Sequence, residues 1–340
     1  MSDDGSDGGA DDPLTYHVNG DLVPADEATV SVRDRGFMYG DGAFETLRVY
    51  GGEPFEWAAH RDRLRRTAET LGFADAVPDD LRERVAETLT ANDLDEAYCK
   101  VSVTRGVQPG KLTPDPDVDP TVVVYVAPLG RGGVEGDPVW DEPATVQTVR
   151  TRRPPAESFP ADAKTHNYLP GILARLELRR AATEEFAADE AVMRTTDDYL
   201  AEGAASNLFF VDGGTLKTPS ADLPILPGVT RSVVTDLAES EGFSVRTSRY
   251  TLDDLRDADE VFLTNSTWEV RPVTSVDGID VSVGPMTRLL ARLFDERVER
   301  EHYGGNGSED VRATGGEGPA DGDATDGEPP ADGNAADDGG

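Results

Sequence analysis

The sequence predicts a mixed α/β (α+β) protein with two domains. Hairpin signals and alternating β-α signals occur in the same chain, which favours layers of sheet and helix. A stretch rich in Gly and Pro at residues 129–142 marks a linker, and 340 residues suffice for two hydrophobic cores. Eight regular βα units are not visible, so a TIM barrel is not expected. We predict a small N-terminal α/β domain at 14–128 and a larger domain at 143–303.

The two ends of the chain are expected to be disordered acidic tails. Residues 1–13 and 304–340 are rich in Gly, Asp, Ala and Pro and hold few large apolar side chains, so they cannot offset the entropy of ordering. The formal net charge of the whole chain is −35, and residues 1–12 and 304–340 account for −5 and −9 of it. The part between them still carries −21.

The acidic residues are spread along the chain, which argues against some partners and suggests the solution conditions in which the protein works. No basic stripe is available to neutralise phosphates, so we expect no binding to nucleic acid. An acidic surface suits solution in concentrated salt, where screening reduces self-repulsion, which predicts a cytoplasmic protein of a salt-loving organism. No stretch approaches 18 apolar residues and the N-terminus is acidic, so neither a membrane span nor a signal peptide is expected.

Cysteine and aspartate patterns give no metal site. Cys99 is the single cysteine, which leaves no disulfide framework and no thiolate metal site. It lies in a strand-like run, and we interpret it as a small buried residue. The run Asp115–Asp119 mimics the start of a calcium loop, but it lacks the later Gly and Glu and contains prolines, so an acidic loop is the better interpretation.

In the N-terminal domain, Asn19-Gly20 predicts the turn of a hairpin over 16–23. The glycines at 31–42 resemble a phosphate loop, but their spacing is not GxGxxG and no helix follows. We interpret this segment as a close turn that aims Tyr39 and the next strand inward. The remaining elements expected here are strand 43–50, a Gly51-Gly52 turn, helices 57–71 and 81–90, and strands 98–104 and 121–127.

The second domain begins after the linker with a strand and continues as mixed elements. We expect strands at 144–149, 190–194, 244–249 and 260–264, a turn with the segment 199–211, and helices at 168–183, 230–241 and 285–300.

Lys164 is the first candidate for chemistry. It lies where a Pro-rich loop meets a helix with apolar residues. A lysine in a dry pocket has a lowered pKa, and its neutral amine attacks carbonyl groups. The alternative is an ordinary solvated loop lysine, so Lys164 decides nothing by itself.

Three further segments could act together with this lysine. Glu202, in a turn of small residues, can pair with a cationic ring nitrogen. Residues 226–231 are a turn entering a helix N-terminus, which attracts phosphate, and 264–267 offer hydroxyls and amides after a buried strand. Each has a plain alternative: a surface Glu, a helix cap, a strand-end turn. With Arg61, the set supplies what pyridoxal 5′-phosphate needs.

In this order the motifs resemble the class IV aminotransferase family, the fold type IV pyridoxal-phosphate enzymes. The resemblance covers residues 14–300, and it rests on the following segments: Arg35-Gly36, Tyr39–Thr46, His60-Arg61 with Arg63-Leu64, Lys164 with Asn167, Glu202-Gly203 with Asn207–Phe209, Leu226–Arg231 and Glu269–Val273. The resemblance implies two α/β domains with the active site between them, and a homodimer whose partner contributes to the pocket.

The resemblance also implies roles for individual residues. Lys164 would hold the cofactor as a Schiff base and move the proton at the substrate Cα. Glu202 would stay ionised against the pyridine nitrogen. Tyr168 would reach the ring hydroxyl, although its spacing from the lysine is one residue shorter than in branched-chain enzymes. The phosphate would be bound by Arg61, Val229, Thr230, Ser266 and Thr267, and the amino-acid-type substrate by Tyr39 and Arg105, unless Arg105 is a surface residue.

The reaction itself is left between two alternatives. Thr46, where branched-chain enzymes have Gly, and the loop Thr104-Arg105-Gly106 both resemble 4-amino-4-deoxychorismate lyases, with Thr46 in a proton relay. D-amino-acid enzymes favour a His after this loop, and Gln108–Lys111 has none. We place the lyase first and an amino-acid transaminase (branched-chain or D-amino acid) second. A non-catalytic acidic binding protein is a distant alternative, since Lys164 and Glu202 are intact.

Overall fold

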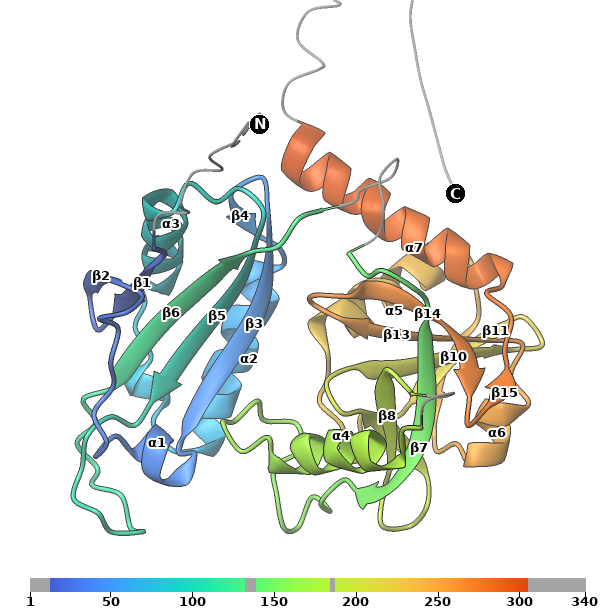
Figure 1. The fold of residues 1–340 in the computed structure, drawn as a ribbon, viewed down its shortest axis with the longest axis horizontal. Coiled ribbons are helices and arrows are strands. Elements are labelled where there is room, and N and C mark those ends of the chain that lie inside the picture. Colours follow the sequence, from blue (N-terminus) through green and yellow to red (C-terminus); the bar gives the residue numbers. More distant parts are fainter. Residues whose placement is uncertain (1–12, 132–138, 184–186, 305–340) are drawn as a thin grey trace, which may run out of the picture. The chain divides into compact units, whose positions relative to one another are not determined.

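The structure, a computed structural model, contains two β-sheets with helices packed against them (Figure 1). It describes residues 13–131, 139–183 and 187–304, which belong to one compact unit. The mixed architecture confirms the predicted fold class. The first sheet is built from strands before residue 129 and the second from strands after residue 143. The two predicted tails, apart from residues 13 and 304, and residues 132–138 of the predicted linker lie outside the described residues.

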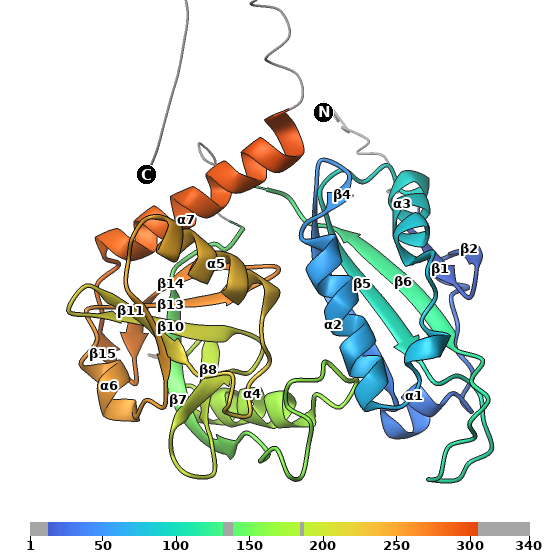
Figure 2. The ribbon, with the colours of Figure 1, turned by 180° about the vertical axis from the view of Figure 1, so that it is seen from behind.

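The first sheet is antiparallel throughout, in the order β2-β1-β6-β5-β3-β4. Its strands are β1 (Thr15–Val18), β2 (Asp21–Pro24), β3 (Gly42–Tyr50), β4 (Glu53–Pro54), β5 (Ala97–Thr104) and β6 (Thr121–Pro128). Helices α2 (Trp57–Thr70) and α3 (Leu81–Ala91) pack on one face, as Figure 2 shows, with a short 3₁₀ turn at Ala74–Ala76 between them. Leu64 and Val85 from these helices share a core with Leu47, Cys99 and Val124 of the sheet.

Most predicted elements of this half are confirmed, with one difference. Asn19 and Gly20 both have positive φ, as a two-residue hairpin turn requires, and the hairpin joins β1 to β2. The segment at 31–42 is not only a turn: it contains the short helix α1 (Arg35–Tyr39). The Asp34 side chain accepts hydrogen bonds from the N–H groups of Gly36 and Phe37, and a five-residue helix is too short to show a period in the sequence.

The second sheet has nine strands in the order β12-β11-β10-β13-β14-β7-β8-β9, with β15 paired to β14. The pairs β14/β7, β7/β8 and β11/β12 are parallel, and the others are antiparallel. The strands are β7 (Ala144–Arg152), β8 (Glu190–Arg194), β9 (Leu200–Gly203), β10 (Asn207–Asp212), β11 (Thr215–Pro219), β12 (Val245–Ser248), β13 (Glu260–Asn265), β14 (Glu269–Val276) and β15 (Ile279–Asp280).

Four helices and one π-helical turn accompany this sheet in the described part of the chain. They are α4 (Leu169–Ala181), α5 (Val229–Ser240), α6 (Leu252–Arg256), α7 (Pro285–Val298) and the turn Glu299–Tyr303. Helices α5 and α7 bury Val233, Leu290 and Phe294 against the sheet. Tyr50 and Phe55 of the first half join the same core, and Tyr50 Oη donates a hydrogen bond of 2.5 Å to Glu269 Oε1. Side-chain contacts therefore connect the two sheets directly.

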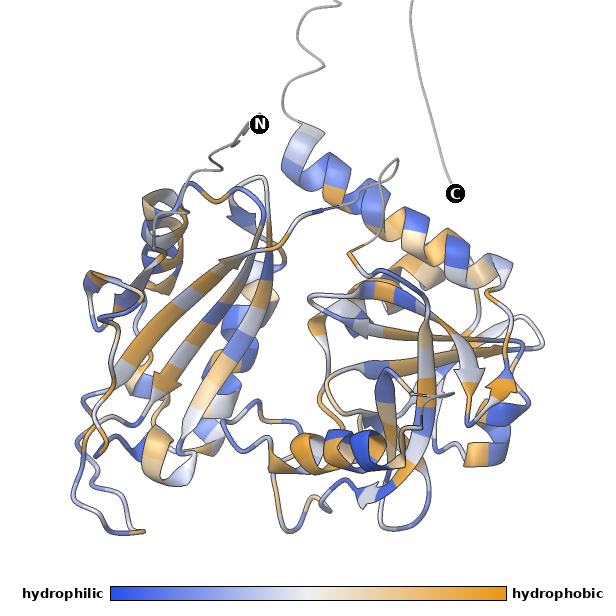
Figure 3. Ribbon diagram, in the orientation of Figure 1, coloured by the Kyte–Doolittle hydropathy of each residue, from blue (hydrophilic) through white to orange (hydrophobic). Residues whose placement is uncertain are grey.

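Helix α4 differs from the others in the face it exposes. Its buried residues are Gly171, Ala174 and Leu178, all on one side. Four other apolar residues are exposed, namely Leu169, Ile172, Leu173 and Leu176. Figure 3 colours much of this helix as apolar. No helix in the described ranges is long and apolar enough to cross a membrane.

Candidate active site

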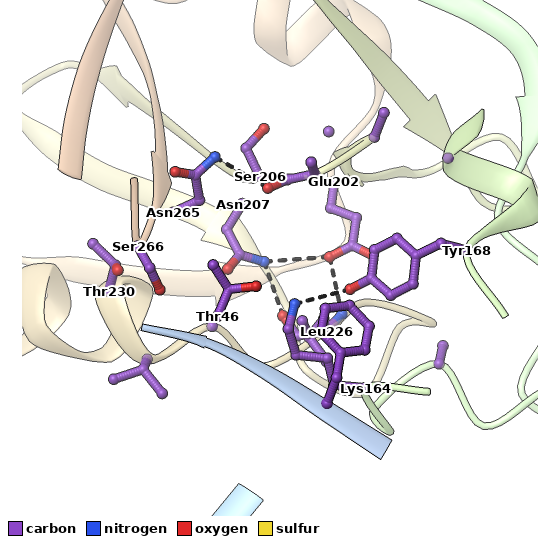
Figure 4. A pocket seen from close by; sticks show the side chains of 18 of the residues that line it. Thr46, Lys164, Tyr168, Glu202, Ser206, Asn207, Leu226, Thr230, Asn265 and Ser266 are labelled. Carbon is purple, nitrogen blue, oxygen red and sulfur yellow. Dashed lines mark hydrogen bonds between the residues drawn. The ribbon is translucent and has the colours of Figure 1, made fainter. Parts of the chain in front are cut away.

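A cavity of about 280 Å³ lies between segments of both halves of the chain. Phe44 and Thr46 of β3 and Arg63 of α2 form one side of it. The other sides come from 159–171, 202–207, 226–230 and 264–267. Lys164, Glu202 and the N-terminus of α5, which the sequence places far apart, therefore reach one space (Figure 4).

Hydrogen bonds fix the backbone of Lys164. Its N–H donates to Thr67 Oγ1 at 3.0 Å, and its carbonyl accepts from the N–H of Phe44 at 3.0 Å. These two hydrogen bonds attach the segment before α4 to helix α2 and strand β3. The side chain is half-buried, and its Nζ lies 4.6 Å from the centre of the Phe44 ring. A lysine fixed at both backbone groups can present its amine at one point of the cavity.

Tyr168 places a hydroxyl beside this amine. Lys164 Nζ and Tyr168 Oη are 3.0 Å apart, within hydrogen-bonding distance (Figure 4). Tyr168 stands immediately before α4, and its ring packs edge-on against Phe44. The shorter spacing between lysine and tyrosine therefore still brings the two side chains together.

Glu202 is a buried carboxylate that faces the cavity from β9. It accepts hydrogen bonds from Leu226 N at 2.9 Å and Asn207 Nδ2 at 3.3 Å, and Arg153 Nε lies 3.1 Å away. Burial raises its pKa to about 7, although the charge of Arg153 acts in the opposite direction. Because burial disfavours the lone anion, this carboxylate gains from a cation placed beside it.

The other end of the cavity suits an anion. Val229 and Thr230 form the first turn of α5, and no side chain in the described structure caps this helix, whose N-cap is Gly228. Free N–H groups and the macrodipole of a helix N-terminus attract phosphate. Ser266 and Thr267, in the turn after β13, line the same end.

Two neighbouring side chains complete this end of the cavity. Asn265 Oδ1 accepts from the N–H groups of Thr267 and Trp268 and so shapes the turn that carries Ser266 and Thr267. Thr264 also lines the cavity, and its buried hydroxyl has no hydrogen-bond partner within the described part of the chain.

Arg61 does not lie where the sequence reasoning placed it. Its side chain is 47% exposed and pairs with Asp62, its neighbour on the surface of α2. Arg63, two residues later, is buried and lines the cavity. The phase of the helix explains the error, because His60, Arg63 and Thr67 share the buried side of α2 and Arg61 does not.

Tyr39 and Arg105 are also placed away from this cavity. Arg105 is neither a surface residue nor part of the cavity wall: it is buried, pairs with Asp41 at 2.8 Å and donates to the carbonyl of Leu71. Tyr39, expected to point inward, is half-buried, with the Arg35 guanidinium over its ring, and is not part of the cavity wall. Thr46, in contrast, lines the cavity.

Several residues of the site were missed by the sequence reasoning. Arg153 and Asn207 contact Glu202. The ammonium of Lys100, which is not part of the cavity wall, lies 4.5 Å from the centre of the Phe44 ring. Burial, and secondarily the charge of Lys164, lowers the pKa of Lys100. Lys100 lies on β5 directly across from Thr46. Its alternation with the buried Cys99 and Val101 is the sequence signal that could have placed it on the other face of this strand.

Comparisons with known proteins identify the family of this chain. Residues 42–276 match the family model for amino-transferase class IV. A provisionally named branched-chain-amino-acid aminotransferase of Methanocaldococcus jannaschii is 35% identical over 291 residues, covering 83% of this chain and 96% of the relative. The D-alanine aminotransferase of Listeria monocytogenes is 34% identical over 295 residues, with coverage of 83% and 96%.

Solved structures of enzymes with related names have a similar fold. The T.th. branched-chain amino acid aminotransferase, in complex with N-(5′-phosphopyridoxyl)-L-glutamate, superposes with a TM-score of 0.74 at 30% identity, covering 84% of this chain and 94% of that one. A provisionally named 4-amino-4-deoxychorismate lyase of Legionella pneumophila gives 0.69 at 26% identity, with coverage of 79% and 95%.

The two-sheet fold and the lysine site define a pyridoxal 5′-phosphate enzyme of fold type IV. The chain belongs to the class IV aminotransferase family. The residues present fit the cofactor, since an amine, a buried carboxylate and an uncapped helix N-terminus meet in one cavity. When bound, pyridoxal 5′-phosphate supplies an aldehyde that bonds to an amine and a ring that accepts electrons.

Proposed function

We propose that this enzyme is an amino-acid transaminase, which moves an amino group from an α-amino acid to a 2-oxo acid. The observation that carries the proposal is the meeting of Lys164, Tyr168 and Glu202 in one cavity. This arrangement supports acid-base chemistry at a substrate Cα. The choice of amino transfer is supported by the two relatives described above, at 35% and 34% identity, both of which carry aminotransferase names.

The roles proposed for this chain follow from its geometry. Lys164 Nζ removes the proton from the substrate Cα and would return it to the cofactor carbon that carried the aldehyde, because this amine reaches into the cavity. Tyr168 Oη, at 3.0 Å, orients that amine. Glu202 pairs with a protonated ring nitrogen, and Arg63, Thr230 and Ser266 bind the phosphate. Lys100, an ammonium near the Phe44 ring, offers a partner for a substrate carboxylate.

For the substrate we propose a branched-chain L-amino acid. Aromatic side chains supply much of the apolar wall: Phe44, Tyr98, Phe159 and Tyr168. Such a wall suits an aliphatic side chain better than the methyl group of alanine, because burial gains grow with the apolar area covered. The branched-chain names of the Methanocaldococcus relative and of the T.th. structure support the same choice.

The lyase remains a second candidate because of one observation. Thr46, the residue that resembles the lyases, presents its side chain to the cavity. Its hydroxyl is therefore available for a proton relay. We now place the lyase second, since the solved structure with that name is 26% identical to this chain, below the two aminotransferases.

The deciding experiment gives the holoenzyme each substrate separately. We expect glutamate from L-leucine with 2-oxoglutarate, and much less from D-alanine with 2-oxoglutarate. Aminodeoxychorismate should yield neither pyruvate nor 4-aminobenzoate. Formation of these two products without amino transfer would instead assign the lyase reaction, and preference for D-alanine would overturn the substrate assignment.

Lys164→Ala tests the central residue. We expect at least about a thousandfold loss of transaminase rate, because both proton transfers lose their base. Borohydride should also fix no cofactor on this variant. Lys111→Ala, at an exposed lysine outside the cavity, is the matched control and should keep wild-type activity. A Lys164→Ala enzyme with more than a tenth of the wild-type rate would contradict the assignment.

We also propose that the enzyme works as a cytoplasmic homodimer. The support is the apolar outer face of α4, where Leu169, Ile172, Leu173 and Leu176 are exposed in the single chain. Contiguous exposed apolar side chains on a helix commonly mark an interface.

A further inference from the structure

Two buried residues behind Arg63, Glu45 and His60, have no part in the roles given so far. Glu45 Oε1 and Oε2 accept from Arg63 Nε and Nη2 at 2.7 and 2.6 Å, and Oε2 also lies 2.7 Å from His60 Nδ1. All three residues are less than 5% exposed. Glu45 stands on β3, whereas His60 and Arg63 are one turn apart on α2. The contact therefore fixes a strand to a helix beside the cavity.

The protonation states of this cluster are set by its members. Burial opposes ionisation of Glu45, but the charge and hydrogen bonds of Arg63 and the contact with His60 lower its pKa to about 2. Burial lowers the pKa of His60 more than Glu45 raises it, so the imidazole is neutral and Nδ1–H donates to the carboxylate. The anion of Glu45 thus faces one guanidinium and one neutral donor.

Arg63 also reaches the second half of the chain. Its Nη1 donates to the carbonyl of Pro227 at 3.0 Å, immediately before Gly228 and the first turn of α5. A guanidinium has five N–H groups in a fixed plane. Glu45 takes two and Pro227 takes one, which leaves two for the cavity that Arg63 lines. Because the plane is rigid, the contacts on one edge determine where the other edge points.

We propose that Glu45 and His60 are positioning residues that aim Arg63 at the cofactor phosphate and, through Arg63, hold the Pro227 loop in place. We expect their effect on cofactor binding mainly at the phosphate, which Arg63 would contact. The inference uses the cofactor of the family and does not depend on whether the reaction is amino transfer or lyase chemistry.

The test separates this role from a purely structural ion pair by comparing two ligands. The apo-protein is titrated with pyridoxal 5′-phosphate and with pyridoxal, which lacks the phosphate, and binding is followed by tryptophan fluorescence. Glu45→Gln should weaken binding of the phosphate form by about 10- to 100-fold, the range for a lost charge-assisted hydrogen bond. Pyridoxal binding should change by less than about threefold, since its contacts do not include Arg63.

A double-mutant cycle then asks whether Glu45 acts through Arg63. Glu45→Gln combined with Arg63→Gln should bind the phosphate form as weakly as Arg63→Gln alone. Additive losses would overturn the proposal, as would an equal loss for both ligands or no loss for either. Glu260→Gln is the control: Glu260 is also buried, but it accepts from Met286 N and Thr287 N at α7. It should not discriminate between the ligands.

Two milder variants keep the proposal testable if Glu45→Gln does not fold. Glu45→Asp retains the charge on a shorter side chain, and His60→Asn retains a donor near the carboxylate. Both should reduce binding of the phosphate form more than binding of pyridoxal, with a smaller loss than Arg63→Gln gives. Equal losses for the two ligands in both variants would refute the positioning role.

Discussion

Two buried carboxylates of this protein have opposite electrostatic surroundings. Glu45 makes two short contacts with Arg63, and its pKa falls to about 2 although burial opposes the shift. Glu202 has one contact with Arg153 and two neutral donors, and burial prevails, so that its pKa rises to about 7. Glu45 is therefore ionised with its partners already in place, whereas Glu202 gains from a further cation.

The raised pKa of Glu202 predicts how apo-protein stability depends on pH. Well below pH 4.5 the carboxyl is protonated in both folded and unfolded states. As pH rises toward 7, the folded state binds more protons than the unfolded state, so this group's contribution to stability is lost. Relative to Glu202→Gln, wild-type apo-protein should lose about 3 kcal/mol of unfolding free energy between about pH 4 and pH 8.

Urea unfolding of the two apo-proteins across this pH range measures the difference. The glutamine side chain does not titrate, so subtraction removes the other groups. A difference that stays constant, or that grows in favour of the wild type as pH rises, would contradict the assignment. Excess pyridoxal 5′-phosphate should reduce the loss in the wild type, because a bound cation favours the ionised carboxylate.

At the scale of residues, the sequence predicts the kind of chemistry better than it predicts where individual side chains lie. Lys164 and Glu202 could be picked out because an amine, an acid and an anion site occur together only for particular cofactors. Arg61 was chosen over Arg63 because both lie on a basic helix, and only its phase against the sheet distinguishes them. Arg105 could not be placed, since its partner Asp41 is distant in sequence.

At the scale of elements, we predict the effect of substituting Gly228 at the N-terminus of α5. A Cβ on Gly228 would overlap Oδ1 of Asn207. Nδ2 of Asn207 donates hydrogen bonds to the Leu226 carbonyl and to Glu202. Gly228→Ala should therefore displace Asn207, weaken cofactor binding at least about tenfold and cost about 1–3 kcal/mol of stability. Gly130→Ala is the control, because a Cβ there meets open space. Tight cofactor binding by Gly228→Ala would show that the close approach does not matter.

The long elements were predictable because their patterns repeat. Helix α2 was expected at 57–71 and β5 at 98–104, close to their observed bounds. The strands β11 and β14 and the five-residue helix α6 were not predicted. β14 contains Pro272 and an Arg in its buried middle, which conceals a strand, and α6 is stabilised locally by the Thr251 and Asp254 capping box. Which strands pair across the two sheets depends on contacts between distant residues, and one sequence does not give these.

For the whole molecule, the charge of −35 predicts a dependence on salt. Like charges spread over the surface destabilise the compact state, and the screening length falls from about 10 Å at 0.1 M salt to about 3 Å at 1 M. We therefore expect the melting temperature to rise with KCl up to molar concentrations. Scanning calorimetry at fixed pH measures it, with NaCl as a second salt. A melting temperature that does not rise would argue against adaptation to high salt.

The outer face of α4 predicts the state of assembly. Leu169 and Ile172 are 60% and 54% exposed in the single chain, on the side away from the buried Ala174 and Leu178. A twofold interface would cover the same face in both copies. The wild type should then behave in light scattering as a particle of twice 36.4 kDa. Ile172→Glu with Leu173→Glu should behave as a single chain, since each buried charge opposes association.

A matched variant separates this effect from a general one. Ile279→Glu replaces another exposed apolar residue, on strand β15, and should leave the dimer intact. Circular dichroism should show the same helix content for all three proteins, because the substituted side chains are outside the cores. If the α4 variant remains a dimer, the interface lies elsewhere. If the wild type is itself a monomer, the exposed face of α4 needs another explanation, and no residue of a partner completes the cavity around Lys164.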